Sequence, residues 1–433
     1  MGLDPSALSH AGKTVRPGRY RGLPAFVFAL HGWQRREWVS KTFEIRSRRL
    51  KGIKMKITII GAGNAGSACA FMAAETGHKV RLLKTSNHIT HDEHFEAMVS
   101  NKGIYCIDNT KKGHFTDSAD DAEKTFQPLE LITRDPKEAI EGADVVMVFI
   151  QTTYHRALAE RIAKYFEDDQ LVILIPGYAG SIFYNKYCDN NPIFAEGEST
   201  PNDARVVEPG IVKVLFKNAR NSLAFYPATK TPEGMAIASR LFPAYNIEMN
   251  SVRKHIFESA LHNPNIIVHT VGLYVMYPML EYCAKHHPDE IPYMYRDALS
   301  TKMAWLMIEK LDAEKMAVLS ALGCEPIPYL EACLFRNEED LKQDPREVFE
   351  RYKISSPPGP YSFDNRYVTE DVPMGLVLLS SLGDKFGINM PECNRLIEMC
   401  GGILKRDFFE EGRTLASIGL GELTREELLD FVY

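Results

Sequence analysis

Residues 55–84, MKITIIGAGNAGSACAFMAAETGHKVRLLK, constrain the fold more than any other part of the chain. The β-branched run 57–60 is too short for a helix and stops at the glycine-rich turn 61–66. A helix of small residues is expected at 67–75, and a second strand at 79–83. A strand, a turn, a helix and a strand in this order make half of a mononucleotide-binding unit.

The three glycines of this turn have separate roles in such a unit. Gly61 permits the tight turn, Gly63 removes the Cβ that would block a pyrophosphate, and Gly66 lets the helix pack closely on the strand. Free N–H groups at the start of the helix, at Asn64 and Ala65, then face the phosphates. The context therefore predicts dinucleotide binding, with a purely structural turn as the alternative.

Lys84 stands at the end of the second strand, where an NAD-binding site usually places Asp or Glu. Thr85 and Ser86 follow it, and a cation with two hydroxyls suits a 2′-phosphate better than a free ribose. The sequence therefore favours NADP(H), with NAD(H) as the alternative if Lys84 is only a solvated loop lysine.

At 433 residues the chain has room for two domains, and 45% hydrophobic with 25% charged residues is ordinary for a globular protein. Residues 1–54 hold twelve Lys or Arg against three acids, and the remainder holds 39 against 54. This acidic body gives no sign of a nucleic-acid surface, and we expect no apolar run of the roughly eighteen residues that span a bilayer. The eight cysteines are scattered without a CxxC, which predicts reduced thiols in a cytoplasm and no structural zinc.

The first 54 residues are rich in Arg, Gly and aromatic residues and show no sustained periodicity. A transit peptide would also be rich in arginine and poor in acids, but the apolar patch 23–30 and the tryptophans Trp33 and Trp38 fit it poorly. We therefore predict a basic, disordered or non-essential extension before Met55.

Two further buried strands are expected at 144–150 and 171–175. In an open parallel sheet, ligands bind outside the carboxyl ends of the strands, so backbone groups at Thr152 and Gly177 are predicted cofactor contacts. His155 opens the next helix and could contact nicotinamide or substrate, although a structural role is favoured.

Further strands at 129–133, 193–195, 211–216 and 223–226 are expected to complete a Rossmann-type, doubly wound α/β sheet. A hairpin-like excursion is expected at 104–115. The fold class is therefore α/β for the first part of the chain.

The breaker-rich segment TKTPEG at 229–234 predicts a domain junction, so the dinucleotide-binding domain is expected at 55–230. The pattern then changes to long segments with helical spacing, which predicts an all-helical second domain at 231–433. The expected helices are 253–276, 293–322, 329–335, 345–352, 373–386, 392–404 and 424–433. Between them, 355–371 is too rich in Pro and Gly to be helical.

His88, His91 and His94 are spaced so that a helix could bring their imidazoles to one face, and a metal site has to be considered. No cysteine or paired carboxylate framework supports it. A solvated face is favoured, and no metal is predicted.

Two segments of the helical domain gather groups that could do chemistry. In HNPNIIVH, Asn265 and His269 are four residues apart and share a helical face, so the imidazole could reach the interdomain cleft with Asn265 as a substrate contact. A core histidine satisfied by the backbone is the alternative. In RYVTED, Arg366 suits a substrate carboxylate, and Asp371 could instead cap the next helix.

The glycine turn, PGYAG, AEGESTPNDAR, HNPNIIVH and RYVTEDVPMGLVLLSSL followed by GINMPECNRLI together resemble the octopine/nopaline (opine) dehydrogenase family. The resemblance covers nearly all of 55–405, and RYxTEDxPxGL is its most specific part. It implies that His269 donates or accepts a proton, paired with Asp371, and that Arg366 holds a substrate carboxylate. The family commonly has proline where this chain has Thr270, and His262 is a second candidate, although His269 is favoured.

The resemblance implies an NAD(P)H-dependent reductive condensation of a 2-oxo acid with the α-amino group of an amino acid, with these small molecules as partners. One alternative is a ketopantoate- or glycerol-3-phosphate-type reductase, which usually relies on a catalytic lysine. Lys254 and Lys302 stand in no comparable motif. The other alternative is a non-catalytic dinucleotide-sensing protein. The sequence identifies neither substrate and leaves the oligomeric state open, a homodimer included.

Overall fold

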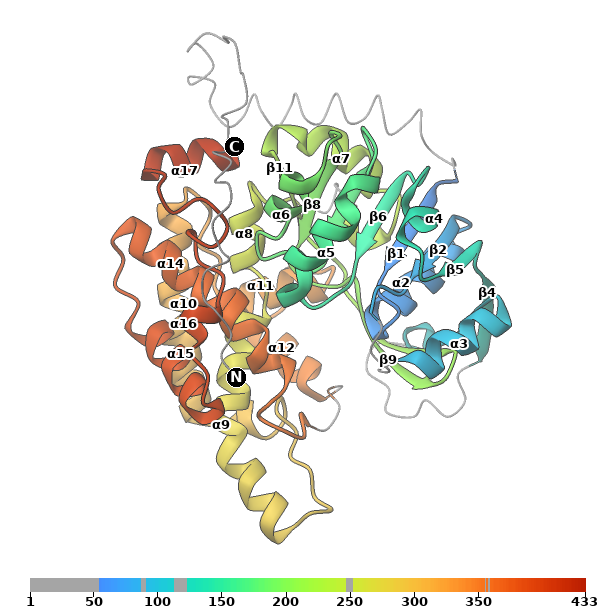
Figure 1. Cartoon of the computed structure of the whole chain (residues 1–433). Coiled ribbons are helices and arrows are strands. Elements are labelled where there is room, and N and C mark those ends of the chain that lie inside the picture. Colours follow the sequence, from blue (N-terminus) through green and yellow to red (C-terminus); the bar gives the residue numbers. More distant parts are fainter. Residues whose placement is uncertain (1–53, 87–90, 113–122, 247–251, 355, 357–358) are drawn as a thin grey trace, which may run out of the picture.

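The computed structural model describes residues 54–86, 91–112, 123–246, 252–354, 356 and 359–433. Figure 1 shows a sheet domain beside a helical domain, formed by the earlier and the later parts of the chain. The predicted Rossmann-type α/β fold with a helical domain after it is confirmed. The predicted extension before Met55 lies outside the described residues except for Lys54, and so does His88.

A seven-stranded sheet forms the centre of the first domain, in the order β11-β8-β7-β6-β1-β2-β5. Its strands are β1 (Lys56–Ile60), β2 (Lys79–Leu83), β5 (Leu131–Thr133), β6 (Val145–Val148), β7 (Leu171–Leu174), β8 (Ile193–Gly197) and β11 (Leu223–Tyr226). All neighbouring strands are parallel except β11, which runs antiparallel to β8. The strand order reverses between β1 and β6, and this reversal makes the carboxyl ends of these two strands the expected ligand-binding edge.

Helices cover both faces of this sheet because successive side chains of a strand point to opposite faces. The helices are α2 (Asn64–Glu75), α4 (Pro136–Ile140), α5 (His155–Ile162), α6 (Ser181–Tyr187) and α7 (Thr231–Ala238). Val146 and Val148 pack in one core with α4, α5 and α6, whereas Val145 and Met147 pack in another with α2 and α7. The first core continues into the helical domain, so the two domains share apolar packing.

A second sheet of four strands lies beside α2, in the order β4-β3-β10-β9. Its strands are β3 (Gly103–Asp108), β4 (Lys124–Pro128), β9 (Asn202–Glu208) and β10 (Ile211–Lys217), and α3 (Asp92–Asn101) precedes it. The prediction that 211–216 completes the main sheet is therefore wrong. A tight turn at Gly210 pairs β10 with β9, a strand that the sequence analysis did not identify. The hairpin-like excursion exists, but its second strand, β4, begins beyond 115.

The second domain is helical in all its main elements. They are α8 (Ile256–Leu261), α9 (Asn265–His286), α10 (Lys302–Ala321), α11 (Tyr329–Asn337), α12 (Pro345–Ile354), α13 (Arg366–Thr369), the π-helix η8 (Asp371–Leu376), α14 (Val377–Phe386), α15 (Pro391–Leu404), α16 (Phe408–Glu411) and α17 (Arg425–Val432).

Several predicted boundaries differ from those in the structure, and three of the differences are large. The expected helix 253–276 is divided, because the chain turns at 262–264 and α9 starts after Pro264. The expected helix from 293 begins only at α10, where the Thr301 hydroxyl accepts a hydrogen bond from the Ala304 N–H as its cap. The segment 355–371, expected to be non-helical, contains the short α13 at its end.

The structure places α7 against the main sheet rather than in the helical domain. Met235 and Ala238 pack in the same core as β1, β6 and β7. The domain boundary at residue 230 stays a prediction. The residues of α7, which follow it, pack against the sheet of the first domain.

One helical segment among the described residues, 256–286, is long and apolar enough to cross a membrane by length and composition alone. The expectation that no apolar run reaches this length does not hold here. Half of the apolar window, 50%, is buried inside the protein, because α9 is a core helix of the second domain.

Gly66→Ala tests the close packing of α2 on β1. A Cβ at Gly66 would lie 1.9 Å from the carbonyl oxygen of Gly61, so the helix would have to shift away from the strand. We expect the free energy of unfolding to fall by about 2 kcal/mol, measured by chemical denaturation. Gly402→Ala is the control, because a Cβ there meets nothing within 4 Å and Ala favours helix by about 0.5–1 kcal/mol. Equal stability of Gly66→Ala and the wild type would contradict the packing.

Candidate active site

A cavity of about 1310 Å³ lies between the carboxyl ends of the sheet strands and the helical domain. From the sheet domain, 61–66, 84–86 and 149–151 line it, and from the helical domain 263–265 and 365–367 do so. The predicted site residues on its wall are Gly61, Gly63, Asn64, Ala65, Gly66, Lys84, Asn265, His269 and Arg366. One cavity thus brings together residues that the sequence assigned to cofactor and to substrate.

The glycine turn has the geometry of a phosphate-binding loop. Gly61 has a φ of +115°, and a Cβ there would lie 2.3 Å from the carbonyl oxygen of Phe149. The Cβ position of Gly63 is different, because its nearest neighbours are ring atoms of His91 at 3.7 Å. Packing within the protein therefore does not demand glycine at 63, whereas close approach of a dinucleotide to the backbone would. The start of α2 opens onto this space.

The Lys84 side chain is buried at the cavity wall, 4% exposed. Its Nζ donates to the carbonyl oxygen and the hydroxyl of Ser86, at 3.0 and 3.1 Å, and lies 2.9 Å from an Asp92 carboxylate oxygen. Arg161, also from the sheet domain, lines the same cavity. Two cations and a hydroxyl therefore border the cavity after β2, where the outer ribose of a dinucleotide is held in this fold.

The structure does not bring Thr152 and Gly177 to the cavity wall. The Thr152 N–H and hydroxyl donate to Glu370 Oε1 at 2.8 and 3.0 Å. The Gly177 carbonyl accepts from Arg413 Nη1 at 3.1 Å. Their backbone groups connect the two domains, and the neighbouring Gln151 and Pro176 line the cavity instead.

His269 and Asp371 form a buried pair, with His269 Nδ1 2.8 Å from Asp371 Oδ2. The Tyr178 hydroxyl donates to the other carboxylate oxygen of Asp371 at 3.0 Å. Asp371 is therefore not a helix cap, because its carboxylate bonds side chains from α9 and from the loop after β7. A carboxylate only accepts, so His269 donates through Nδ1–H and keeps Nε2 for the cavity side.

The π-helix η8 places Asp371 against α9. A Cβ at Gly375 of this helix would lie 2.3 Å from Ile266 and 3.1 Å from the Tyr178 ring. Glycine therefore allows η8, α9 and Tyr178 to approach closely, one helical turn from His269 on α9. Single π-turns of this kind are frequent at functional sites.

Two tyrosines fix the plane of the His269 ring. Tyr367 stacks on it with ring centroids 3.6 Å apart and planes 8° from parallel. Tyr295 meets its edge, with centroids 6.4 Å apart. Both tyrosines line the cavity, so the imidazole is held in one orientation while its free nitrogen stays accessible.

Arg366 and Glu370 form a second connection between the domains. Arg366 Nε donates to Glu370 Oε2 at 3.0 Å, and Glu370 accepts from Thr152 through its other oxygen. The terminal amino groups of Arg366 bond no other group of the described chain, and its side chain is 47% exposed at the cavity. Burial raises the pKa of the Glu370 carboxyl, an effect that the Arg366 charge opposes. The arrangement leaves a guanidinium edge free for an anion.

Sequence reasoning missed several groups of the site. Tyr178 stands in PGYAG and Arg205 in AEGESTPNDAR, two segments that the resemblance had already singled out. Arg205 lines the cavity and pairs with Asp203 at 2.6 Å. Arg413 lies beyond the recognised motifs and donates to carbonyl oxygens of Gly177, Tyr178 and Thr152. No local signal in the sequence marks Arg413.

The alternative residues of the sequence analysis lie away from this cavity wall. His262 is buried, and burial holds its pKa well below the ordinary value. His155 is fully buried, and burial lowers its pKa to about 3. Lys254 donates to the Gly323 carbonyl at the surface. Lys84 is the one lysine of the described residues that lines the cavity, so Lys254 and Lys302 have no access to it.

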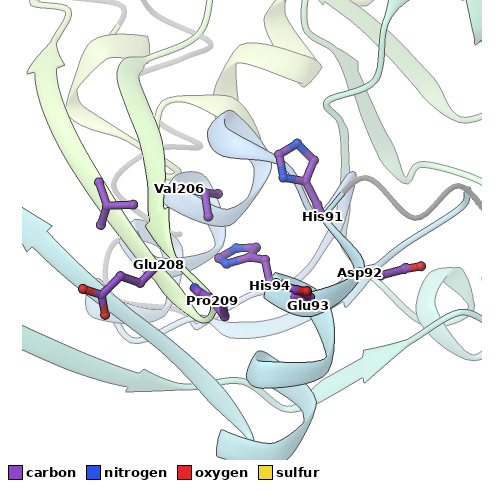
Figure 2. Close-up of a pocket in the computed structure, with 8 residues that line it drawn as sticks. His91, Asp92, Glu93, His94, Val206, Glu208 and Pro209 are labelled. Atoms are coloured by element: carbon purple, nitrogen blue, oxygen red, sulfur yellow. The ribbon is translucent and has the colours of Figure 1, made fainter.

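The suspected histidine site is a small pocket of about 530 Å³ between α3 and β9. Figure 2 shows that the rings of His91 and His94 do not converge on one point. His94 Nε2 lies 3.0 Å from the Ser67 hydroxyl, and His94 Nδ1 accepts from the Gly210 N–H at 2.9 Å. Within the described ranges, no group of three or more His, Cys, Asp or Glu could hold a metal ion.

Comparisons with known proteins match both halves of the chain. Residues 252–404 match the family described as NAD/NADP octopine/nopaline dehydrogenase, alpha-helical domain, and residues 56–179 match the NAD-dependent glycerol-3-phosphate dehydrogenase N-terminus. An opine dehydrogenase of Arthrobacter sp. (strain 1C) is 28% identical over 304 residues, 68% of this chain and 80% of that protein. An octopine dehydrogenase of Mizuhopecten yessoensis is 25% identical over 372 residues, 79% of this chain and 88% of that protein.

Solved structures share the fold over most of the chain. Octopine dehydrogenase with NADH and L-arginine has a TM-score of 0.65 at 20% identity, covering 87% of this chain and 98% of that one. NADP⁺-bound yersinopine dehydrogenase has a TM-score of 0.56 at 14% identity, covering 88% and 98%.

The fold, the cavity and the two matched domains define a dinucleotide-dependent dehydrogenase with a helical second domain. The helical domain belongs to the octopine/nopaline dehydrogenase family of NAD(P)-dependent oxidoreductases, and the relatives that match most of the chain are opine dehydrogenases.

The burial of His94 can be tested by measuring how stability depends on pH. Burial, with a smaller effect of His91, lowers the pKa of His94 from 6.5 to about 4. Between these values the unfolded chain binds the additional proton, so stability should fall as the pH falls from 6.5 to 4. In His94→Gln, we expect the unfolding free energy from urea titrations to depend less steeply on pH in this window. The exposed His286→Gln is the control, and equal slopes in both variants would contradict the prediction.

Proposed function

We propose that this protein catalyses the NAD(P)H-dependent reductive condensation of a 2-oxo acid with the α-amine of an amino acid. The observation that carries the proposal is the His269–Asp371 pair, 2.8 Å apart, whose imidazole lines the cavity that also contains the glycine turn. A proton-transfer group and a dinucleotide loop in one cavity fit a reaction that moves both a proton and a hydride.

Condensation expels water from the amine and the oxo acid to form an imine. In the proposed mechanism, protonated His269 delivers a proton from Nε2 to the leaving oxygen. Asp371 holds Nδ1–H, which fixes the ring and stabilises its charged form, and Tyr178 orients Asp371. Loss of that water leaves the imine protonated on nitrogen, and a bound reduced nicotinamide would supply the hydride that converts it to a secondary amine.

Arg366 is the proposed partner of a substrate carboxylate. Its Nε is occupied by Glu370, which leaves the two terminal amino groups directed to an anion. Tyr367 stacks on His269 and follows Arg366 in the chain, so the guanidinium and the imidazole are positioned by one short helix. Fixing the carboxylate in this way would hold the imine carbon for hydride attack. Asn265, whose side chain lines the cavity, is the proposed second substrate contact.

The alternative reductase of the ketopantoate or glycerol-3-phosphate type is less well supported. Such enzymes usually use a lysine near the substrate, and Lys84, the cavity-lining lysine of the described chain, lies after β2 beside Ser86 and Asp92. Oxidation of cofactor with an oxo acid alone, without amine, would favour that alternative. Binding without turnover would favour the sensing protein.

NADPH is the proposed cofactor, supported by Lys84 and Ser86 at the expected position of a 2′-phosphate. Relatives with NADH and with NADP⁺ are both known in structures of this fold. A cytoplasmic location is proposed with it, supported by eight cysteines that are all free.

A screen of NAD(P)H oxidation tests the activity, with amino acids crossed against pyruvate, 2-oxoglutarate and glyoxylate. In the best pair, His269→Ala should lower kcat by about 10²- to 10⁴-fold, because general acid–base catalysis contributes this much. Cofactor affinity, measured by fluorescence quenching, should be nearly unchanged. Near-normal turnover of His269→Ala would overturn the assignment, and His286→Ala serves as the surface control.

Lys84→Met tests the cofactor preference. Loss of the ammonium should raise the Kd of NADPH about tenfold and leave the Kd of NADH almost unchanged, because a 2′-phosphate gains a charged hydrogen bond there. Titrations of the wild type and the variant with both cofactors measure this. Tighter binding of NADH than of NADPH by the wild type would contradict the preference.

A further inference from the structure

Arg336, in the last turn of α11, has a guanidinium that is not paired by any of the residues that the structure describes. The residue is only 6% exposed and lines the cavity. No hydrogen bond or ion pair joins its guanidinium to a group of the described chain, yet none of its nitrogens is among the buried polar atoms sealed from solvent. The guanidinium therefore reaches the cavity and lacks a partner there.

The surroundings of Arg336 make its lack of a partner costly. Tyr329 and Tyr352 line the same cavity, and their hydroxyls and the Cys333 thiol act electrostatically on its charge. Glu198 is the nearby acid, but its carboxylate is bound by Arg253 at 2.9 Å and makes no ion pair with Arg336. A buried charge without a partner costs free energy, and arginine stays charged at any physiological pH. The stability of the fold therefore does not account for this residue.

A wall of aromatic rings connects Arg336 with His269. The His269 edge meets Tyr295 at a centroid distance of 6.4 Å, and Tyr295 meets Tyr352 at 5.5 Å. Tyr352 in turn borders Arg336. Arg366 reaches His269 from a different direction, because its neighbour Tyr367 stacks on the ring face. Both arginines and the imidazole thus line one cavity, and Arg336 is linked to His269 through Tyr352 and Tyr295.

The charge of the cavity wall favours anions. Its described lining contains five Lys or Arg side chains and a single acid, Asp203, although the whole chain has a net charge of -6. Asp203 is paired with Arg205 at 2.6 Å. A cationic amino acid side chain would find no unpaired carboxylate on this wall, whereas an acidic group would find Arg336.

We propose that Arg336 binds a second, remote carboxylate, so that one of the two substrates is acidic beyond its reacting end. This inference rests on the proposed function, in which Arg366 holds the carboxylate next to the reacting carbon. The acidic partner is either a dicarboxylic 2-oxo acid or an amino acid with a carboxylate side chain. A guanidinium that is only 6% exposed binds a carboxylate strongly because water competes little there.

Four substrate pairs test the proposal, with pyruvate or 2-oxoglutarate crossed against alanine or glutamate, in the wild type and Arg336→Met. We expect a pair with an additional carboxylate to have the highest kcat/KM in the wild type. For that pair Arg336→Met should lower kcat/KM about 30-fold, chiefly through KM, and for pyruvate with alanine by no more than about threefold. Arg336→Lys should restore part of the loss.

Two controls separate binding from folding. Arg351→Met removes the same charge from α12, outside the cavity, and should change no rate. Arg336→Met should melt at or above the wild-type temperature, since an unpaired buried charge is removed.

The outcomes distinguish the role of Arg336 from the proposed function. A loss confined to 2-oxoglutarate pairs identifies the oxo acid as the acidic partner, and a loss confined to glutamate pairs identifies the amino acid. Equal turnover of all four pairs with no effect of Arg336→Met would overturn the inference and leave the proposed function standing. No turnover in the wider screen of amino acids and oxo acids would overturn the proposed function, and the inference with it.

Discussion

Two adjacent buried carboxylates, Glu370 and Asp371, hold the candidate site together. Each accepts hydrogen bonds from both domains: Glu370 from Thr152 and Arg366, and Asp371 from Tyr178 and His269. Burial of two neighbouring negative charges is unfavourable unless each is fully hydrogen-bonded. The same contacts that satisfy these carboxylates therefore fix the distance between the two domains and the orientation of the imidazole.

This constraint explains why the chemistry lies at the domain interface. The loops after β6 and β7 supply Thr152 and Tyr178, and the strand order places these loops at the edge where a dinucleotide binds. The helical domain supplies His269 and Arg366 from α9 and α13. The cavity forms only where both sets of elements meet, so neither domain alone contains a complete site.

Much of the fold follows from local sequence patterns. Local residue types predict the first elements of the sheet domain. β-branched residues favour the strand at 57–60, glycines the turn at 61–66, and small residues the helix after it. The pairing of His269 with Asp371 was assigned by resemblance, and the structure brings these two side chains to 2.8 Å. Their roles, and those of Arg366 and Lys84, stay proposals.

Other features could not be predicted because they depend on contacts between distant residues. β10 reads as a strand, but only its pairing with β9 and β3 places it in the second sheet. Thr152 and Gly177 stand at the expected loops, yet Glu370 and Arg413 occupy their backbone groups. Arg336 carries no signal in the sequence, because what sets it apart is that its guanidinium has no hydrogen-bond or ion-pair partner among the described residues.

Arg413 has a consequence for how the domains of related enzymes can be exchanged. It lies after the last residue of the matched helical domain, 404, and bonds three carbonyl oxygens of the sheet domain. A chimera in which the helical domain ends at residue 404 would lack this guanidinium, which binds carbonyl oxygens in the loops after the adjacent strands β6 and β7. Recombination between relatives must therefore keep the segment from 405 to α17 with the helical domain. The loops whose carbonyl oxygens Arg413 binds must come from the same parent.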